Sequence, residues 1–158
     1  MKKGSINSLT AQERKSPGGK YHLFRKNLSE AIGGKKDTGA WGGGHPFDVE
    51  WYRLPPGAVN FPHHAHAAQW EMYLFVSGSG QVRGPEETCE VTEGDFLMFP
   101  PNEAHSVINT GKEDLVFYVI ADQPRADVIS YPDTGKWVVK PPLRCFRMED
   151  ADYYEKGD

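Results

Sequence analysis

The sequence has no long apolar run and few cysteines, and each shortage argues against a class of protein. Within its 158 residues no apolar stretch approaches the ~18 residues that a membrane-spanning helix needs, so we expect no membrane partner. The basic start Met1–Gly4 is followed by no apolar segment, which argues against a secretory signal and favours a cytoplasmic protein. Cys89 and Cys145 form no metal-binding or redox motif, so we expect two separate reduced thiols.

Positive charge is scarce outside the N-terminal region. Residues 1–36 hold nine lysine and arginine residues against two acidic ones, whereas residues 37–158 hold nine against twenty. A basic arm can bind nucleic acid or an anionic neighbour. Here the basic residues are scattered among glycine, serine and asparagine with few aromatic residues, so the composition favours a solvated arm and no nucleic-acid partner.

Turn-forming residues are abundant, and they divide the chain into short strands. The 17 glycines and 12 prolines separate apolar or alternating segments that predict an all-β sandwich or barrel. The run Leu115–Ile120 is continuous enough to be buried on both faces, and Ser77–Gly80 is a hairpin-turn signal. The other predicted strands are residues 47–54, 59–66, 72–76, 81–83, 87–92, 96–99, 128–131 and 137–139, with one more at His105.

The predicted barrel occupies the middle of a single domain. We assign residues 1–46 to an N-terminal extension, 47–122 to the barrel, and 123–158 to C-terminal strands and an acidic tail packed on the same domain.

The extension carries only weak local signals. Residues 1–20 are polar and predict no fixed structure, while Tyr21–Phe24 predict a short edge strand. Leu28–Ile32 predict one helical turn, with Ser29 as its cap and Gly33-Gly34 as its end. The glycine-rich segment Trp41–Pro46 predicts a loop, because it lacks the lysine of a phosphate-binding loop.

Three histidines and one carboxylate form the strongest chemical signal. Side chains two residues apart on a strand share a face, so His64 and His66 can bind one ion together. Glu71 begins the next predicted strand, and His105 is a fourth candidate ligand. Imidazole and carboxylate ligands suit iron, manganese, zinc or nickel. The pattern therefore predicts one divalent transition metal per chain, of unknown identity.

The spacing of these residues resembles the two motifs of the cupin superfamily. The first motif runs from Gly57 through the two histidines and Glu71 to Gly78. The residues that resemble the second motif are Gly94, Pro100, Asn102, His105 and Asn109. Cupins usually have glycine where Asn102 stands, and asparagine is among the few residues that tolerate a positive φ. The resemblance implies a double-stranded β-helix, a small jelly-roll barrel with the metal inside it.

Neighbouring side chains offer further candidates for the site. Glu71 and Tyr73 are candidate catalytic residues, and alternation places Tyr73 on the face of Glu71. The face that Arg53 shares with Trp51 either borders the pocket, where arginine binds carboxylate or phosphate, or lies on the surface. His63 should point away from His64, as a supporting or surface imidazole.

Two functions remain open from the sequence. An open metal site supports either dioxygenase-type chemistry or sugar-phosphate-isomerase-like chemistry on a small polar metabolite. Tyr131–Lys136 also resembles the tail of small cupins described as sugar-phosphate isomerases. The alternative is a noncatalytic module that binds a metal or a small ligand. The cupin resemblance also implies a homodimer formed through the outer face of one sheet, with the strand at Tyr21–Phe24 adding to the partner's sheet edge.

Overall fold

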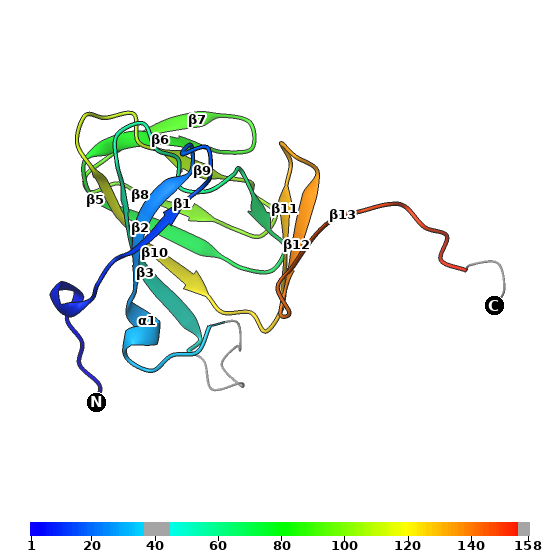
Figure 1. The fold of residues 1–158 in the computed structure, drawn as a ribbon, viewed down its shortest axis with the longest axis horizontal. Helices are drawn as coiled ribbons and strands as arrows, with labels where there is room; N and C mark the ends of the chain where they lie inside the picture. The colour runs from blue at the N-terminus through cyan, green and yellow to red at the C-terminus, as the bar shows by residue number, and fades with distance from the viewer. Residues whose placement is uncertain (37–44, 155–158) are drawn as a thin grey trace.

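The computed structural model describes residues 1–36 and 45–154, which form a β-barrel with short extensions at both ends (Figure 1). Of the predicted loop at Trp41–Pro46, residues 41–44 lie outside this described part. Within it, no helix is long and apolar enough to cross a membrane. Cys89 and Cys145 are both free and exposed.

The described part of the chain is built mainly from strands. In chain order the elements are η1 (Ile6–Ser8), β1 (Gln12–Lys15), β2 (His22–Asn27), α1 (Leu28–Ala31), β3 (Phe47–Leu54), β4 (Ala65–His66), β5 (Glu71–Ser77), β6 (Ser79–Arg83), β7 (Thr88–Thr92), β8 (Phe96–Phe99), β9 (Ser106–Ile108), β10 (Leu115–Asp122), β11 (Asp127–Tyr131), β12 (Lys136–Lys140) and β13 (Arg144–Arg147).

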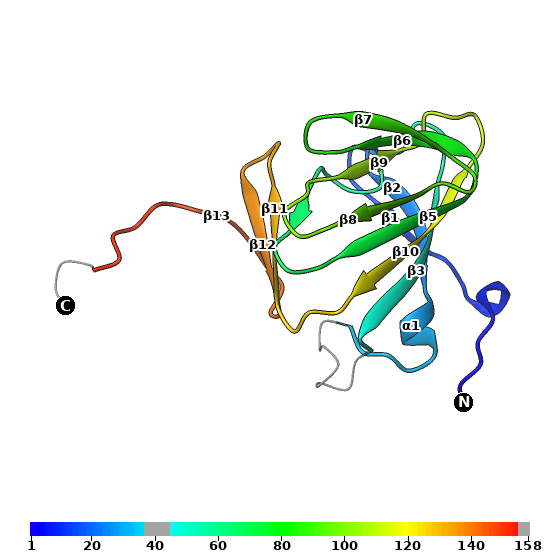
Figure 2. The same ribbon diagram turned by 180° about the vertical axis from the view of Figure 1, so that it is seen from behind.

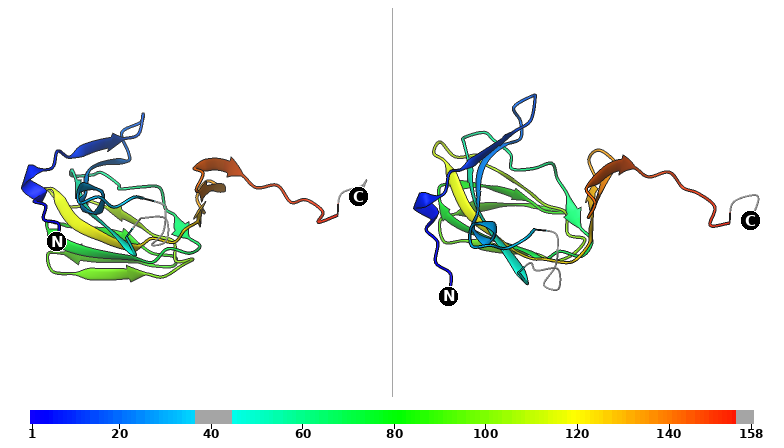
Figure 3. Two further views of the ribbon diagram at one scale, coloured as in Figure 1. Left: turned by 90° about the horizontal axis from the view of Figure 1, so that it is seen from below. Right: turned by 60° about the horizontal axis from the view of Figure 1, so that its bottom comes forward.

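Three antiparallel sheets surround the core. The largest has the strand order β1-β2-β3-β10-β5-β8, and a three-stranded sheet has the order β7-β6-β9. The third, β13-β12-β11-β4, lies at one end of the barrel, as Figures 2 and 3 show. The predicted all-β class and double-stranded β-helix fold are therefore confirmed.

The core lies between the sheets because alternate residues on the central strands, such as β5 and β10, point inward. The side chains that are almost completely buried there include Leu23, Tyr73, Phe75, Val107, Leu115 and Phe117. The strand predictions at residues 47–54 and 96–99 match β3 and β8 at both ends. Residues 47–54 alternate, and residues 96–99 are a short apolar run after a turn, and both patterns are easy to locate in a sequence.

The N-terminal extension is more ordered than its polar sequence predicts. Residues 1–20 contain η1 and β1, so the expectation of no fixed structure is wrong. β2 is not an edge strand either, because β1 pairs with one side of it and β3 with the other. The helical turn does form, but Asn27 caps it by accepting a hydrogen bond from the backbone N–H of Glu30, whereas Ser29 is buried and accepts one from the backbone N–H of Val49.

Two further expectations about strands are corrected by the sheet topology. Residues 59–66 form only the two-residue β4 together with isolated bridges at Val59 and His64. The segment Ser77–Gly80 is not a hairpin turn, because β5 pairs with β8 and β10 whereas β6 pairs with β7 and β9. The chain instead passes at Gly78 from one sheet to another.

The apolar run of β10 is fully buried on one face only. Leu115, Phe117, Val119 and Ala121 are buried, whereas the alternate residues are partly accessible on the outer face of the six-stranded sheet. The expectation of burial on both faces is therefore wrong for the described chain. The outer face stays apolar without cover from the rest of the described chain.

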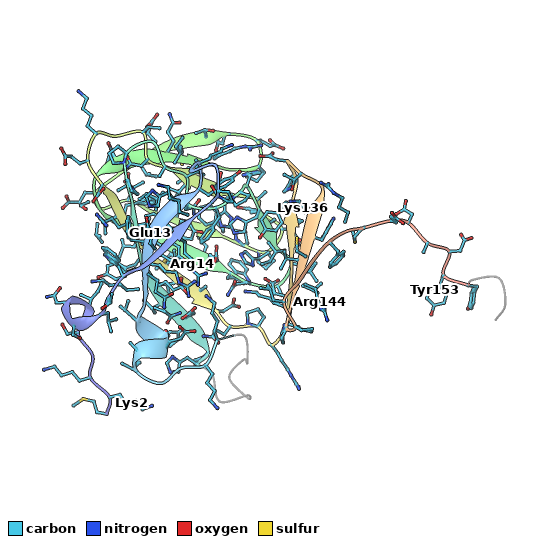
Figure 4. The ribbon with its side chains drawn as sticks, viewed as in Figure 1. Lys2, Glu13, Arg14, Lys136, Arg144 and Tyr153 are labelled. Carbon is cyan, nitrogen blue, oxygen red and sulfur yellow. The ribbon has the colours of Figure 1, made fainter. Side chains whose placement is uncertain are left out.

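The C-terminal residues lead away from the barrel. Figure 4 shows Tyr153 on the segment that extends beyond β13, on the side of the molecule opposite Lys2. Residues 148–154 are exposed and form no strand or helix, as expected for an acidic solvated tail.

Position 78 requires glycine for two reasons: its backbone conformation and the close approach of neighbouring main-chain atoms. Its φ is +84°, and a Cβ there would lie 2.5 Å from the carbonyl oxygen of Asp114. Gly57 has a similar φ of +76°, but a Cβ there would meet nothing within 4 Å. Substitution at Gly57 therefore adds only backbone strain, whereas substitution at Gly78 adds a clash with a main-chain atom.

We predict that Gly57→Ala lowers the free energy of unfolding by about 1–2 kcal/mol, the cost of a left-handed conformation for alanine. Gly78→Ala should lower the free energy of unfolding by clearly more, because its Cβ would also clash with the main-chain oxygen of Asp114. Urea denaturation of both variants measures the difference. Equal losses would contradict the role assigned to Gly78.

Candidate functional site

The candidate ligands come together because two distant segments form a backbone bridge. The N–H of His64 donates to the carbonyl of His105 at 3.1 Å, and the N–H of His105 donates back at 2.8 Å. The ring centroids of these two residues lie 4.8 Å apart. β4 then pairs with β11, where His66 lies opposite Ile129. The bridge and this pairing hold all three imidazoles on one side of the barrel interior.

Glu71 occupies the space between the imidazoles. The ligand atoms of His64, His66 and Glu71 all lie within 4.8 Å of one another, so these residues form a group that can hold a metal ion. Nε2 of His66 lies 3.8 Å from one oxygen of Glu71, and Nε2 of His105 lies 2.9 Å from the other. The structure thus brings together all four residues that the sequence singled out as candidate ligands.

Each imidazole is oriented by an acceptor outside the site. Nδ1 of His64 donates to the carbonyl of Pro62 at 2.9 Å, and Nδ1 of His105 donates to the carbonyl of Glu103 at 3.1 Å. Nδ1 of His66 lies 2.5 Å from a carboxylate oxygen of Asp127. Because Nδ1 carries the proton in each ring, Nε2 is left with a lone pair for a metal.

The short distance between Nε2 of His105 and the Glu71 carboxylate indicates how the site could bind a cation. Nε2 of a neutral imidazole that is protonated on Nδ1 is an acceptor, and so is a carboxylate oxygen. Two acceptors 2.9 Å apart need a cation to hold them together. A metal ion bound by both atoms would satisfy these two acceptors together. The donor set therefore fits a divalent transition metal.

Tyr73 completes the site from the neighbouring position on β5. Its hydroxyl donates to Oε2 of Glu71 at 3.1 Å and lies 3.2 Å from Nε2 of His105. As expected from alternation, Tyr73 is on the same face as Glu71, and its ring is buried against Phe99 and Phe117.

Aromatic rings hold two of the imidazoles in place. Phe99 stacks on His105 with ring centroids 4.0 Å apart, and Tyr131 stacks on His64 at 5.9 Å. Tyr131 comes from β11, in the C-terminal part of the chain. The imidazoles are thus fixed both by hydrogen bonds and by packing.

A cavity of about 180 Å³ gives access to these residues. His64, His66, Glu71 and Tyr73 line one part of it, and side chains of β2 and β3 line another. On β3 the lining residues are Asp48, Glu50 and Tyr52, not Trp51 and Arg53. Arg53 lies on the outer face, where it pairs with Asp114 at 2.7 Å and packs over Phe24, so the surface alternative for this residue is the right one.

His63 points into a different cavity from His64. It lines a separate space of about 270 Å³ together with Arg83 and Asp133. The side chain is buried, and burial, with a smaller contribution from Arg83, lowers its pKa. The expectation that His63 and His64 face opposite ways therefore agrees with the cavities they line.

Residues 50–121 match the family model described as "Cupin domain". This segment is a cupin domain. The match includes the four candidate ligands, and the barrel has the corresponding fold.

Two solved structures are similar to this cupin over nearly its whole length. One, from Acidithiobacillus ferrooxidans, is described as a candidate sugar phosphate isomerase. It is 22% identical in sequence with a TM-score of 0.78, and the alignment covers 96% of this chain and 93% of the other. The second, a sugar phosphate isomerase from Silicibacter pomeroyi, is 21% identical, with a TM-score of 0.76 and 92% coverage of each chain. At these identities the likeness shows the fold.

A curated relative resembles the barrel region alone. The "Oxalate-binding protein" of Thermotoga maritima is 31% identical over 68 residues, which cover 43% of this chain. The aligned part spans 55% of the relative's own length.

Burial and charge shift the pKa values within the cupin site. Burial is the main cause that lowers the pKa of His64 to about 3, and the neighbouring His105 adds to it. Burial alone would raise the pKa of Glu71, but the hydrogen bond with His105 and the surrounding imidazoles outweigh it and hold that pKa well below its usual range. Burial and the Glu71 charge raise the pKa of Tyr73 well above 10. Glu71 is therefore ionised and Tyr73 protonated at neutral pH.

Two groups that contribute to the cavity were missed by reasoning from the sequence. Asp127, which orients His66, is 61 residues away from it in the chain, and no local pattern links the two. The acidic pair Asp48 and Glu50 had a usable signal, because its two-residue spacing on a predicted strand is the same as that of His64 and His66.

We predict that His64 makes the metal-free protein less stable as pH falls from 7 to 5. This histidine takes up a proton near pH 6.5 in the unfolded chain but only near pH 3 in the folded chain. Its contribution to the free energy of unfolding is therefore fully present above pH 6.5 and is lost as the pH decreases. This loss amounts to roughly 2 kcal/mol between pH 7 and pH 5. His64→Gln should lose correspondingly less over that interval.

Urea denaturation at both pH values, in the presence of a chelator, measures this difference. The matched control is His22→Gln, because His22 lies on β2 outside the cavity. If His64→Gln kept the full pH dependence of the native chain, the burial of a neutral imidazole at this position would be refuted.

Proposed function

We propose that this cupin is a metal-dependent enzyme that acts on a small polar metabolite. His64, His66, Glu71 and His105 would hold one divalent transition metal. The observation that carries the proposal is the shared orientation of the three imidazoles, whose Nδ1 atoms are all held by acceptors outside the site. Such support for ligand orientation is typical of metal sites, and a surface histidine has no need of it.

A bound metal would polarise a substrate carbonyl or lower the pKa of a bound water. The residues of the chain supply the proton chemistry. The Tyr73 hydroxyl keeps its proton at neutral pH and faces the same cavity as the ligands, so it is suited to act as a general acid. Glu71 is ionised, and it accepts the hydrogen bond that directs this hydroxyl.

These roles favour isomerase-like acid–base chemistry as the reaction class. Its support from comparison is the fold shared with proteins described as sugar phosphate isomerases. Dioxygenase-type chemistry on a chelating substrate is the second reaction class, and iron in the purified protein would favour it.

The second candidate function is a noncatalytic binding module. The observation that favours it is the match between the barrel region and the oxalate-binding protein of Thermotoga maritima. A binder needs the ligand site but no proton donor, so Tyr73 discriminates between the two functions. Tyr73→Phe should abolish turnover in an enzyme and leave ligand affinity nearly unchanged in a binder.

We expect the protein purified without chelators to contain about one divalent metal per chain. His64→Ala, His66→Ala and His105→Ala should each greatly reduce that content, because each removes a direct ligand. Glu71→Ala should reduce it less completely. Inductively coupled plasma mass spectrometry measures the metal identity and stoichiometry together.

His63→Ala is the matched control for these variants, because this buried imidazole adjoins His64 but lines another cavity. It should leave the metal content unchanged. Asp127→Asn should bind metal about 10- to 100-fold more weakly, since it removes the carboxylate that orients His66. Unchanged metal content in the triple histidine variant would eliminate the proposed site.

We also propose that the protein forms a homodimer through the outer face of the six-stranded sheet. Two rows of apolar side chains cross four strands there: Trp51, Tyr118, Leu74 and Phe96 in one row, and Val49, Ile120, Met72 and Met98 in the other. Phe96 is 69% exposed and Met98 is 53% exposed. An apolar patch of this kind on a soluble protein typically marks an interface, and a two-fold axis would cover both copies at once. Strand addition through Tyr21–Phe24 is not part of this proposal, because both sides of β2 are occupied.

Light scattering at micromolar concentration should give about twice the 17.7 kDa mass of one chain. Phe96→Glu places a charge in the patch and should shift the mass to that of a monomer. Leu143→Glu is the control, because Leu143 is 77% exposed but lies outside the six-stranded sheet. A monomeric native chain, or a dimer unaffected by Phe96→Glu, would contradict this interface.

A further inference from the structure

The cavity that contains the candidate ligands has a second charged wall, formed by Arg25, Lys36, Asp48 and Glu50. All four line the same cavity as His64 and Glu71. Arg25 and Glu50 come from the paired strands β2 and β3, where Arg25 lies opposite Tyr52. The Tyr52 hydroxyl bonds to Glu50 at 2.5 Å, and the pKa of Tyr52 is raised well above 10 by burial and by the charges of both Glu50 and Glu71. Tyr52 therefore lies within electrostatic reach of both Glu50 and Glu71.

Glu50 is fully engaged by partners other than Arg25. One carboxylate oxygen accepts hydrogen bonds from Lys36 at 2.7 Å and from Asn27 at 2.9 Å. The other accepts the bond from Tyr52. Burial raises the pKa of Glu50, but the charges of Lys36 and Arg25 and these hydrogen bonds outweigh it, so that the pKa is lowered and the group is ionised.

Arg25 keeps at least one donor without an acceptor among the described residues. Its NH1 atom lies 3.6 Å from Glu50, which is an ion pair without a hydrogen bond. Its Nε is buried and has no hydrogen-bond partner within residues 1–36 and 45–154. A buried N–H donor without an acceptor typically costs about 1–3 kcal/mol. Native proteins rarely leave such a group unpaired, so a water molecule or a ligand normally supplies the acceptor.

The charges around the cavity indicate what that ligand carries. Three basic side chains (Arg25, Lys36 and Lys140) and three acidic ones (Asp48, Glu50 and Glu71) line it, and their formal charges cancel. A divalent metal on the histidines would therefore leave an excess of two positive charges. A ligand with two negative charges would neutralise this excess within the cavity.

The volume of the cavity limits the size of the ligand. At about 180 Å³ it is smaller than the ~300–1,000 Å³ typical of pockets for drug-sized molecules. Its lining combines apolar side chains, among them Phe61, Val119 and Ile129, with six charged ones. A short molecule with charged groups fits this size and these charges better than a bulky or uncharged one.

We propose that the cavity binds a small dianion, with oxygen donors of one end at the metal site and a second anionic group at Arg25. The guanidinium is suited to a carboxylate or a phosphate, both of which accept its planar pair of N–H groups. Arg25 is thus a specificity-determining residue that selects ligands with a second negative charge. The inference rests on the proposed metal-dependent function and names the ligand class for that same site.

Isothermal titration calorimetry on Mn²⁺-loaded protein tests this assignment with three probes. Malonate carries two carboxylates, phosphonoacetate carries one carboxylate and one phosphonate, and acetate is the matched monoanion. The native chain should bind at least one dianion about 10- to 100-fold more tightly than acetate, the range expected for a charged hydrogen bond. The stronger of the two dianions identifies the second group as a carboxylate or a phosphate.

Arg25→Gln should remove this preference and leave the affinity for acetate and the metal content unchanged. Arg53→Gln is the control, because Arg53 is on the same sheet but on its outer face. It should behave as the native chain does. If Arg25→Gln is too unstable to purify, Arg25→Lys should weaken the preference, since an ammonium lacks the paired donors. A crystal structure of the native chain with the preferred dianion should then show an anion oxygen within hydrogen-bond distance of the Arg25 guanidinium.

Equal affinity for dianions and acetate, or a preference that persists in Arg25→Gln, would overturn the inference and leave the metal site standing. An anion found away from Arg25 in the crystal would do the same. Protein that retains no metal would instead overturn the proposed function, and the metal measurement made before each titration separates these two failures.

Discussion

The candidate site depends on hydrogen bonds that its imidazoles donate away from the cavity. Each Nδ1 proton is committed to an oxygen behind the ring, and this commitment leaves the Nε2 atoms of His64, His66 and His105 directed toward Glu71. Two of the acceptors are main-chain carbonyls two residues before their histidine. Local chain geometry therefore sets the tautomer of those rings, and only His66 requires a distant side chain, that of Asp127.

The barrel is what makes this local arrangement possible. His64 and His105 exchange a pair of backbone hydrogen bonds although they are far apart in sequence, and Phe99 and Tyr131 stack against their rings. The hydrogen bond with His105 and the neighbouring imidazoles keep Glu71 ionised, although burial by itself favours its neutral form. The same burial keeps His64 neutral, so the two effects together prepare a site for a cation.

Much of this fold could be predicted from the sequence where patterns are short and regular. Alternation locates β3, a turn followed by an apolar run locates β8, and two-residue spacing places His64 beside His66. Asn102, where cupins usually have glycine, does adopt a positive φ of 71°, and its N–H donates to the carbonyl of His66. These features depend on backbone preferences of single residues or neighbouring pairs, which a sequence displays directly.

Other features depend on contacts that a single sequence does not reveal. The polar segment 12–15 becomes a strand only because β2 offers an unpaired edge, so its order arises from tertiary pairing. Gly78 resembles a turn residue, yet it permits close passage between two sheets. The role of Arg25 follows from what its neighbours leave unsatisfied, and that requires the hydrogen bonds of Glu50 to be known.

The C-terminal strands β11 to β13 contribute to the site although they lie outside the segment that matches the cupin domain. Three residues after the segment 50–121 contribute to the site: Tyr131 and Lys140 line the cavity, and Asp127 contacts the candidate ligand His66. None of the three belongs to the main hydrophobic core. Sequence drift in β11 and β12 can therefore remodel the mouth of the cavity without disturbing the packing that holds the barrel together. A constant barrel with variable terminal strands is one physical route by which similar folds come to serve different small molecules.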